Sequence, residues 1–246
     1  MAYTNSPLVS YTKLSPNHSG QRTHSIDRIT PHCVVGQLSA ESICSCFTST
    51  DRQASCNYGI GKDGRVSLCV EEKNRSWCTS SNSNDQRAIT IECASDETAP
   101  YAMTDAVYAS LIKLCTDICK RNGKKKLLWL ADKDKSLNYN PKADEMVLTV
   151  HRWFANKSCP GDWLYARLGN LAATVTAALG SDANASAPTA PKMDNTPAAW
   201  SKDAVDWAVV EELMTGDDNG NLLLHSNLTR EQFCVMLKRY HDRYAK

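Results

Sequence analysis

The chain of 246 residues is long enough for one sizeable core, or for a core domain with a small appendage. Its 42% hydrophobic and 22% charged residues are typical of a soluble globular protein rather than a disordered or membrane-embedded one. With 28 basic and 27 acidic residues the net charge is +1, which argues against nucleic acid as a partner, and no apolar run reaches the roughly 18 to 20 residues that span a bilayer.

The N-terminal 20 residues contain no basic segment followed by an apolar one, so no Sec signal peptide is predicted. We therefore expect synthesis in the cytoplasm, with release by another factor if the protein acts outside the cell. Eleven cysteines in a long chain of this kind are expected to be reduced thiols, most of them in the core.

The first predicted elements lie between residues 28 and 93. Residues 28–36 (RITPHCVVG) read as a buried strand, and Ser39 is placed to cap a helix that runs through Phe47. Residues 54–70 contain two strand-like runs around a Lys-Asp-Gly turn, which predicts a hairpin. Residues 88–93 (AITIEC) form another short strand.

Two long helices and two more strands are predicted in the next 90 residues. Thr104 can cap a helix that ends near residues 122–123, and strands are expected at 126–131 and 145–150. A further helix is predicted because apolar residues recur at helical spacing at Leu164, Leu168, Leu171 and Val175. Strands interleaved with helices predict an α/β domain with a central mixed sheet flanked by helices.

A change of composition after Gly180 predicts a second part of the chain. Residues 181–197 are rich in Ala, Ser, Asn and Pro and read as a linker between a domain at 1–180 and a small helical module at 198–246. Three residues of the module share one helical face: Trp200, Ala204 and Trp207. A turn is expected at 216–221, and residues 229–232 form a capping box. The helix that this box opens contains Phe233, Met236 and Leu237.

Two of the six histidines stand out as candidate metal ligands. His32 and His151 each lie in or at the end of an apolar strand, where a polar ring needs a reason to be. A lone buried histidine is more often a hydrogen-bonded core residue than a ligand, so the pair alone leaves both interpretations open. The remaining histidines lie in polar surroundings and are expected to be solvated: His18, His24, His225 and His241.

Cys159 is the third candidate ligand. The Pro-Gly that follows it predicts an extended cysteine held by a tight turn. A thiolate needs a metal or a cation to be favoured at neutral pH, and Lys157 alone supplies only part of that. From these residues the segment 151–162 is either half of a metal site or a loop with a buried thiol.

Three motifs together resemble a known family. They are ITPH at 29–32 with a following cysteine, the glutamate of AITIEC, and the pattern H-x5-K-x-C-P-G that begins at His151. They resemble the zinc-dependent N-acetylmuramoyl-L-alanine amidases of the amidase-2 type, which share their fold with peptidoglycan recognition proteins and T7-type lysozymes. The resemblance covers about residues 5–180.

The resemblance implies a zinc cofactor and a role for each site residue. The metal ligands fall on His32, His151 and Cys159, the acid/base glutamate falls on Glu92, and the lysine falls on Lys157. Glu92 would take a proton from water and return it to the leaving amine, while Lys157 would place a positive charge near the developing oxyanion. The bond cleaved would join the lactyl group of N-acetylmuramic acid to L-alanine. Without the resemblance, Glu92 reads as a surface carboxylate in an ion pair.

One departure from the family affects the choice of base. Some relatives carry a catalytic tyrosine on the hairpin strand, and the corresponding place here holds Cys56, with Tyr58 two residues on. Glu92 is therefore the preferred base and Tyr58 the weaker candidate.

Other features have simpler interpretations. The cysteine pairs at 44/46 and 115/119 are predicted to fill the core rather than to bind a second metal. Trp77 either contacts substrate or packs partly on the domain. The five positive charges within 120–126 fit a helix C-terminus, with attraction to anionic wall polymers as the alternative.

Residues 200–241 resemble a single S-layer homology repeat, a module that anchors proteins to secondary cell-wall polymers and usually occurs in three copies. With one copy, the alternatives are weak polymer binding, self-association into a homo-oligomer, or a helical hairpin that packs on the first domain.

The sequence therefore predicts a peptidoglycan-cleaving zinc amidase that acts on the cell wall, of the endolysin kind made by a phage or prophage of a Gram-positive host. A host autolysin with the same chemistry is one alternative. A recognition protein that binds peptidoglycan without cutting it is the other, and the presence of both Cys159 and Glu92 favours catalysis over it.

Overall fold

The computed structural model describes residues 3–181, 194–216, 222, 224, 228 and 230–245. The chain divides into two compact units, residues 1–185 and 186–246. Most of the predicted linker and of the predicted turn at 216–221 lies outside the described residues, and the roles predicted for the two parts stay predictions. No helix in the described part of the chain is long and apolar enough to cross a bilayer.

A seven-stranded mixed sheet forms the first unit, in the order β1-β5-β4-β7-β3-β9-β8. Its strands are β1 (Val9–Thr12), β3 (Arg28–Cys33), β4 (Tyr58–Ile60), β5 (Val66–Leu68), β7 (Ala88–Cys93), β8 (Lys126–Leu128) and β9 (Glu145–Leu148). Neighbouring strands in this sheet run parallel except in the β4–β5 hairpin. Strands β2 (His18–Gln21) and β6 (Asn74–Ser76) pair separately. The predicted α/β class with a mixed sheet is confirmed.

The helices of this unit are α1 (Ala40–Ser45), α2 (Asn82–Arg87), α3 (Asp105–Arg121), α4 (Lys133–Asn138), α5 (Asp162–Tyr165) and α6 (Leu168–Ser181). Two predicted caps are confirmed, because the side chain of Ser39 accepts from the Ser42 N–H and that of Thr104 accepts from the Val107 N–H. The long helix predicted after Thr104 is α3, and it ends at Arg121 with Asn122 as its C-cap.

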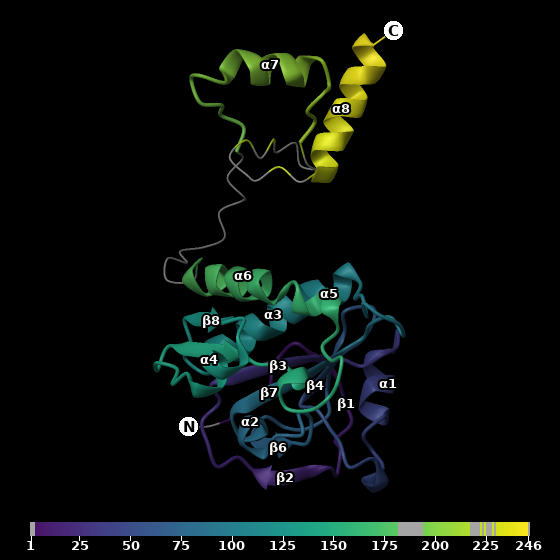
Figure 1. Ribbon diagram of the computed structural model, residues 1–246, viewed down its shortest axis with the longest axis vertical. Coiled ribbons are helices and arrows are strands. Elements are labelled where there is room, and N and C mark those ends of the chain that lie inside the picture. The colour runs from purple at the N-terminus through teal and green to yellow at the C-terminus, as the bar shows by residue number, and fades with distance from the viewer. Residues whose placement is uncertain are drawn as a thin grey trace. The chain divides into compact units, whose positions relative to one another are not determined.

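The two faces of the sheet have different surroundings. Side chains alternate between the faces along a strand, so Ile89 and Ile91 of β7 join the main core with Leu111 of α3, whereas Glu92 leaves on the other face. Helices α3 and α6 pack together over the core face (Figure 1). Helix α1 covers the other face beside the hairpin, where Ile43 lies directly against the backbone of Gly59.

Several sequence predictions in the first unit need correction. The helix expected through Leu164 and Val175 is two helices, because residues 166–167 form a turn between α5 and α6. No helix is predicted in the polar stretch after Trp77, yet it contains α2, whose Ser81 cap accepts from the Asn84 N–H. Short elements of this kind are stabilised by tertiary contacts, and their sequences show no clear hydrophobic periodicity. The same reason explains why the sequence did not predict β1, β2, β6 and α4.

The second unit contains α7 (Lys202–Val210) and α8 (Arg230–Tyr244). The prediction that Trp200 belongs to the first helix is wrong, because α7 begins after it and Trp200 is 91% exposed. The ring of Trp207 stacks on that of Tyr244 with centroids 6.3 Å apart. Phe233, Met236 and Leu237 lie within α8 as predicted, while Thr229 of the capping box and His225 lie outside the described residues.

Candidate metal centre

His32 and Glu92 come together because their strands are paired in register. Strands β3 and β7 are parallel neighbours, and His32 lies directly opposite Glu92 in the pairing. Residues paired in this way project from the same face of a sheet. The His32 ring is buried, and its Nδ1 lies 3.9 Å from Glu92 Oε1.

His151 reaches the same place from the other side of β3. Strand β9 pairs with β3, and soon after β9 ends the chain turns into a short 3₁₀ helix that begins at His151. Both histidines and Glu92 therefore lie at the carboxyl ends of adjacent parallel strands, which is where binding sites form in α/β sheets. The two imidazole rings are 5.1 Å apart at an interplanar angle of 60°.

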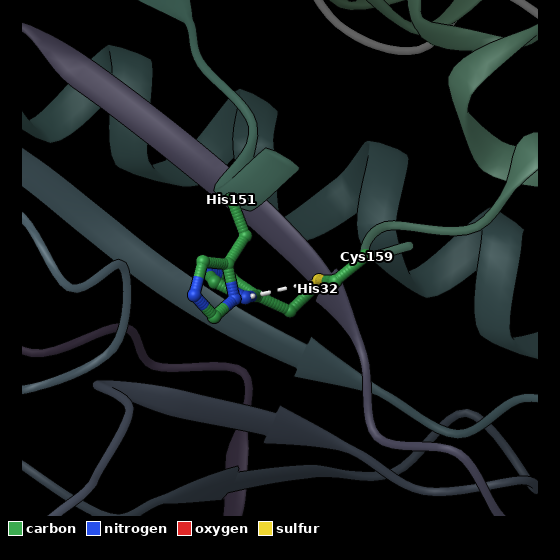
Figure 2. A group of neighbouring side chains, drawn as sticks. All are labelled: His32, His151 and Cys159. Carbon is green, nitrogen blue, oxygen red and sulfur yellow. Dashed lines mark hydrogen bonds between the residues drawn. The ribbon is translucent and has the colours of Figure 1, made fainter. Parts of the chain in front are cut away.

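Cys159 completes the group from the loop at 151–162. The Arg152 N–H donates to the Cys159 carbonyl at 3.1 Å, and the Gly161 N–H donates to the Ser158 carbonyl at 2.9 Å, so the loop closes on itself. The Arg152 guanidinium also binds Asp162 at 3.0 Å. Figure 2 shows the Cys159 thiol directed at the His32 ring, with Sγ 3.2 Å from Nδ1.

The donor set fits a zinc ion. One ligand atom from each of His32, His151 and Cys159 lies within 4.8 Å of the others, and imidazole with thiolate is the ligand chemistry that zinc prefers. His32 Nε2 is buried and has no hydrogen-bond partner among the described residues, so the ring has unused binding capacity. Three protein ligands leave a coordination position for water or substrate, as in catalytic zinc sites.

The pKa shifts of the two histidines and of Cys159 are consistent with a site that binds a metal cation. Burial lowers the pKa of His32 well below its usual value, with His151 adding to the effect, and burial followed by the charge of Lys157 lowers the pKa of His151. Both rings are therefore neutral and able to act as ligands near pH 7. Contact with the Cys33 thiol, then burial, then Glu92 raise the pKa of Cys159. Its thiolate consequently needs a metal to form.

Glu92 is a largely buried carboxyl rather than a member of a surface ion pair. Its side chain is 14% exposed, and its Oε2 atom has no hydrogen-bond partner in the described part of the chain. Burial raises the pKa of Glu92 to about 7, although the Cys78 thiol and the charge of Arg52 act in the opposite direction. A carboxyl with such a pKa can both accept and return a proton near neutral pH.

Comparison with known families gives a direct match over the segment that holds this site. The family model for N-acetylmuramoyl-L-alanine amidase matches residues 22–162, which is more than half of the chain. The chain belongs to the N-acetylmuramoyl-L-alanine amidase family.

Several solved structures are similar to this amidase-family chain at low identity. PlyL is 14% identical, with 67% of this chain and 95% of PlyL covered and a TM-score of 0.48. A mutant endolysin from Bacillus subtilis is 16% identical, with 68% and 99% covered and a TM-score of 0.44. An AmpD derivative is 20% identical, with 68% and 98% covered and a TM-score of 0.47. A comparison with curated proteins finds no match.

The amidase site opens into a cavity of about 890 Å³. His32, His151, Cys159 and Glu92 line it together with Lys157, which is exposed on the same loop as Cys159. The cavity wall also includes Arg52, Trp77 and Tyr101. Trp77 is half-buried, and its indole N–H donates to Ser19 Oγ at 2.7 Å, so the ring packs on the domain. The rest of the side chain remains accessible from the cavity.

The alternative base, Tyr58, is committed to the core of the amidase domain. Its hydroxyl donates to Glu72 Oε1 at 2.5 Å and accepts from the Ser6 N–H at 2.8 Å. Tyr58 is completely buried and does not line the cavity. Cys56, at the place of the family tyrosine, is also buried, and burial raises the pKa of its thiol to about 12. Neither residue reaches the cavity.

All eleven cysteines are free thiols, and most are buried as predicted. Cys44, Cys115 and Cys119 fill the core, but the core assignment is wrong for Cys46, which is exposed and lines the amidase cavity. Helix α1 ends before Cys46, so its side chain leaves the packed face.

Two residues near the site were missed from the sequence. Cys78 Sγ lies 3.8 Å from Glu92 Oε1, and Ser80 Oγ lies 3.5 Å from His151 Nε2. Burial and then the carboxyls of Glu92 and Asp85 raise the pKa of Cys78, so its thiol is protonated and can donate. Both residues lie in a polar stretch without hydrophobic periodicity, and no local sequence pattern indicates that this stretch packs against β7.

Proposed function

We propose that this chain is a zinc-dependent amidase that hydrolyses the bond between the lactyl group of N-acetylmuramic acid and L-alanine in peptidoglycan. The observation that carries the proposal is the convergence of two neutral imidazoles and one thiol beside a buried, unpaired carboxyl oxygen. Membership of the amidase family supplies the substrate class.

In this mechanism the residues of the chain have separate tasks. His32, His151 and Cys159 would hold Zn²⁺, which supplies the Lewis acidity that polarises the scissile carbonyl and makes water acidic enough to react near neutral pH. Glu92 accepts the proton of the attacking water at its free Oε2 atom and then delivers it to the leaving amine. Lys157 provides a fixed positive charge at the cavity wall, where it stabilises the developing oxyanion.

The proposal extends to the biological setting. An amidase domain joined to a second unit that resembles a wall-anchoring repeat fits an enzyme that acts on intact bacterial walls, as a phage or prophage endolysin does. The second unit would bind a secondary wall polymer or mediate self-association, and its exposed aromatic residues Trp200, Phe233 and Tyr240 offer contact area for either.

The experiment that tests the reaction is digestion of purified Gram-positive peptidoglycan with and without a chelator. We expect newly exposed L-alanine amino groups, and their loss when the chelator is present. New reducing sugar ends would identify a glycosidase and contradict the proposal. Binding to the wall without any product would instead indicate a recognition protein.

A further inference from the structure

The catalytic carboxyl has one anchored oxygen and one free oxygen. Glu92 Oε1 lies 3.8 Å from Cys78 Sγ, which is within hydrogen-bond reach for sulfur, while Oε2 is buried without a partner among the described residues. A glutamate side chain has three rotatable bonds, so a buried carboxylate that must face one reacting proton gains from being held at its other oxygen.

Cys78 is itself held in place by a network built around Asp85. The Cys78 N–H donates to Asp85 Oδ2 at 3.1 Å, and the hydroxyl of the adjacent Thr79 donates to Asp85 Oδ1 at 2.6 Å. Asp85 lies on α2 and is 3% exposed. Two residues before Cys78, Ser76 Oγ is 2.8 Å from Thr90 Oγ1 on β7, the strand that carries Glu92.

These contacts connect Cys78 to Glu92 by two routes. Strand β7 carries the carboxyl, and the segment at 76–79 is fixed both to that strand and to α2. The position of the thiol relative to Oε1 is therefore set by the fold rather than by a mobile loop. A buried polar network of this kind specifies the orientation of its members.

We propose that Cys78 is a positioning residue for Glu92: its thiol donates to Oε1 and holds the carboxyl so that Oε2 faces the proton of the reacting water. The inference rests on the proposed amidase function and adds a residue outside the proposed ligand set of His32, His151 and Cys159. Cys78 is among the residues that line the cavity, and its effect on the reaction passes through the contact with Glu92.

The test compares Cys78→Ala with Cys78→Ser in the full-length zinc-loaded protein. The alanine variant should lower kcat by roughly tenfold with KM and zinc content unchanged, because a misaligned general base loses part of its contribution. The serine variant keeps a donor at the same position and should recover most of the rate. Cys119→Ala, which removes a buried thiol on the core face, should retain the wild-type kcat.

A double-mutant cycle with Glu92→Gln separates a positioning role from a general structural one. Because the thiol acts through Glu92, adding Cys78→Ala to Glu92→Gln should cause no further loss of activity. An equal loss in both backgrounds, or a wild-type kcat for Cys78→Ala, would overturn the inference. Full activity of Glu92→Gln alone would overturn the proposed base and the inference with it, so the two failures are distinguishable.

A spectroscopic measurement tests the contact without activity. The S–H stretching band of Cys78 can be assigned by subtracting the infrared spectrum of Cys78→Ala from that of the wild type. A hydrogen bond to a carboxyl lowers the frequency of this band, so Glu92→Gln should shift it upwards. A band with the same frequency in both proteins would show that the thiol does not donate to Glu92.

Discussion

His32 and Glu92 occupy paired positions on β3 and β7, and this pairing gives each residue its chemistry. The sheet buries both side chains, which keeps the imidazole neutral and leaves the carboxyl with a pKa of about 7. His151 and Cys159 then approach from one loop that follows β9. Ligands that come from one strand end and one hydrogen-bonded loop should need little rearrangement to bind an ion.

Loss of one imidazole should remove the metal. We expect His151→Ala to bind no zinc at stoichiometric concentration and to lose amide hydrolysis, because two ligands hold a metal far more weakly than three. The control is His24→Ala, which alters an exposed histidine on the same domain. Zinc content measured by atomic emission after gel filtration checks the prediction, and one equivalent of zinc on His151→Ala would contradict it.

Tyr58 should affect stability and leave the chemistry intact. Tyr58→Phe removes the hydroxyl that links Glu72 to the Ser6 backbone. Glu72 keeps its ion pair with Arg121, whereas the buried Ser6 N–H loses its acceptor, so the change should cost about 1 to 3 kcal/mol of unfolding free energy. Urea denaturation measures this, with Tyr3→Phe as the control, because the hydroxyl of the half-buried Tyr3 makes a solvent-exposed hydrogen bond to the His24 carbonyl. A normal stability with a large fall in kcat would instead return Tyr58 to the candidate bases.

At the scale of elements, the features that could be predicted from the sequence are those set by residues close together in the chain. The caps at Ser39 and Thr104 and the hairpin turn are local, and the structure has all of them. The register that sets His32 opposite Glu92 is a contact between strands about 60 residues apart, and no local pattern specifies it. The candidate ligands could be named from motifs, whereas Cys78 could not, because α2 and Asp85 fix its position through tertiary contacts.

The turn after Cys159 should control the geometry of the metal site. Gly161 has a φ of +81°, and an added Cβ would lie 2.9 Å from the Pro100 carbonyl oxygen, so Gly161→Ala must displace the loop. Gly123→Ala is a matched control, because Gly123 has a φ of +66° and nothing within 4 Å of the added atom. Both variants should lose about 1 kcal/mol of stability or more.

Only the Gly161 variant should weaken zinc binding. Competition with a chromogenic chelator gives the zinc Kd of each variant, and the Kd should rise for Gly161→Ala and stay near wild type for Gly123→Ala. Equal Kd values for the two variants would show that the loop position does not govern the ligand set.

At the scale of the molecule, the ligands and the proposed base lie within the first unit. Residues 1–185 should therefore fold alone, bind one zinc ion and hydrolyse a soluble muramyl peptide at close to the full-length rate. If the second unit binds wall polymer, the same fragment should sediment less with intact walls. Circular dichroism, zinc analysis and a pull-down assay on the fragment test these points. A folded fragment that binds no zinc would contradict the assignment of the metal site to the first unit alone.

The second unit shows the limit of sequence-based prediction most clearly. Its two helices were expected from their periodicity, but the described residues of α8 include no buried side chain, and α7 buries only Ala208. Such a unit has a small core of its own. The identity of its ligand depends on a surface rather than on a motif, so neither wall binding nor self-association follows from the pattern.

If one zinc ion at His32, His151 and Cys159 supports amide hydrolysis, the activity should follow the zinc content of the protein. The most direct measurement is to strip the protein with a chelator, remove the chelator, and titrate zinc back while recording amino groups released from purified peptidoglycan. We expect no release from the stripped protein and full recovery at one equivalent of zinc per chain. Full release from the zinc-free protein, or no release from the reloaded one, would contradict it.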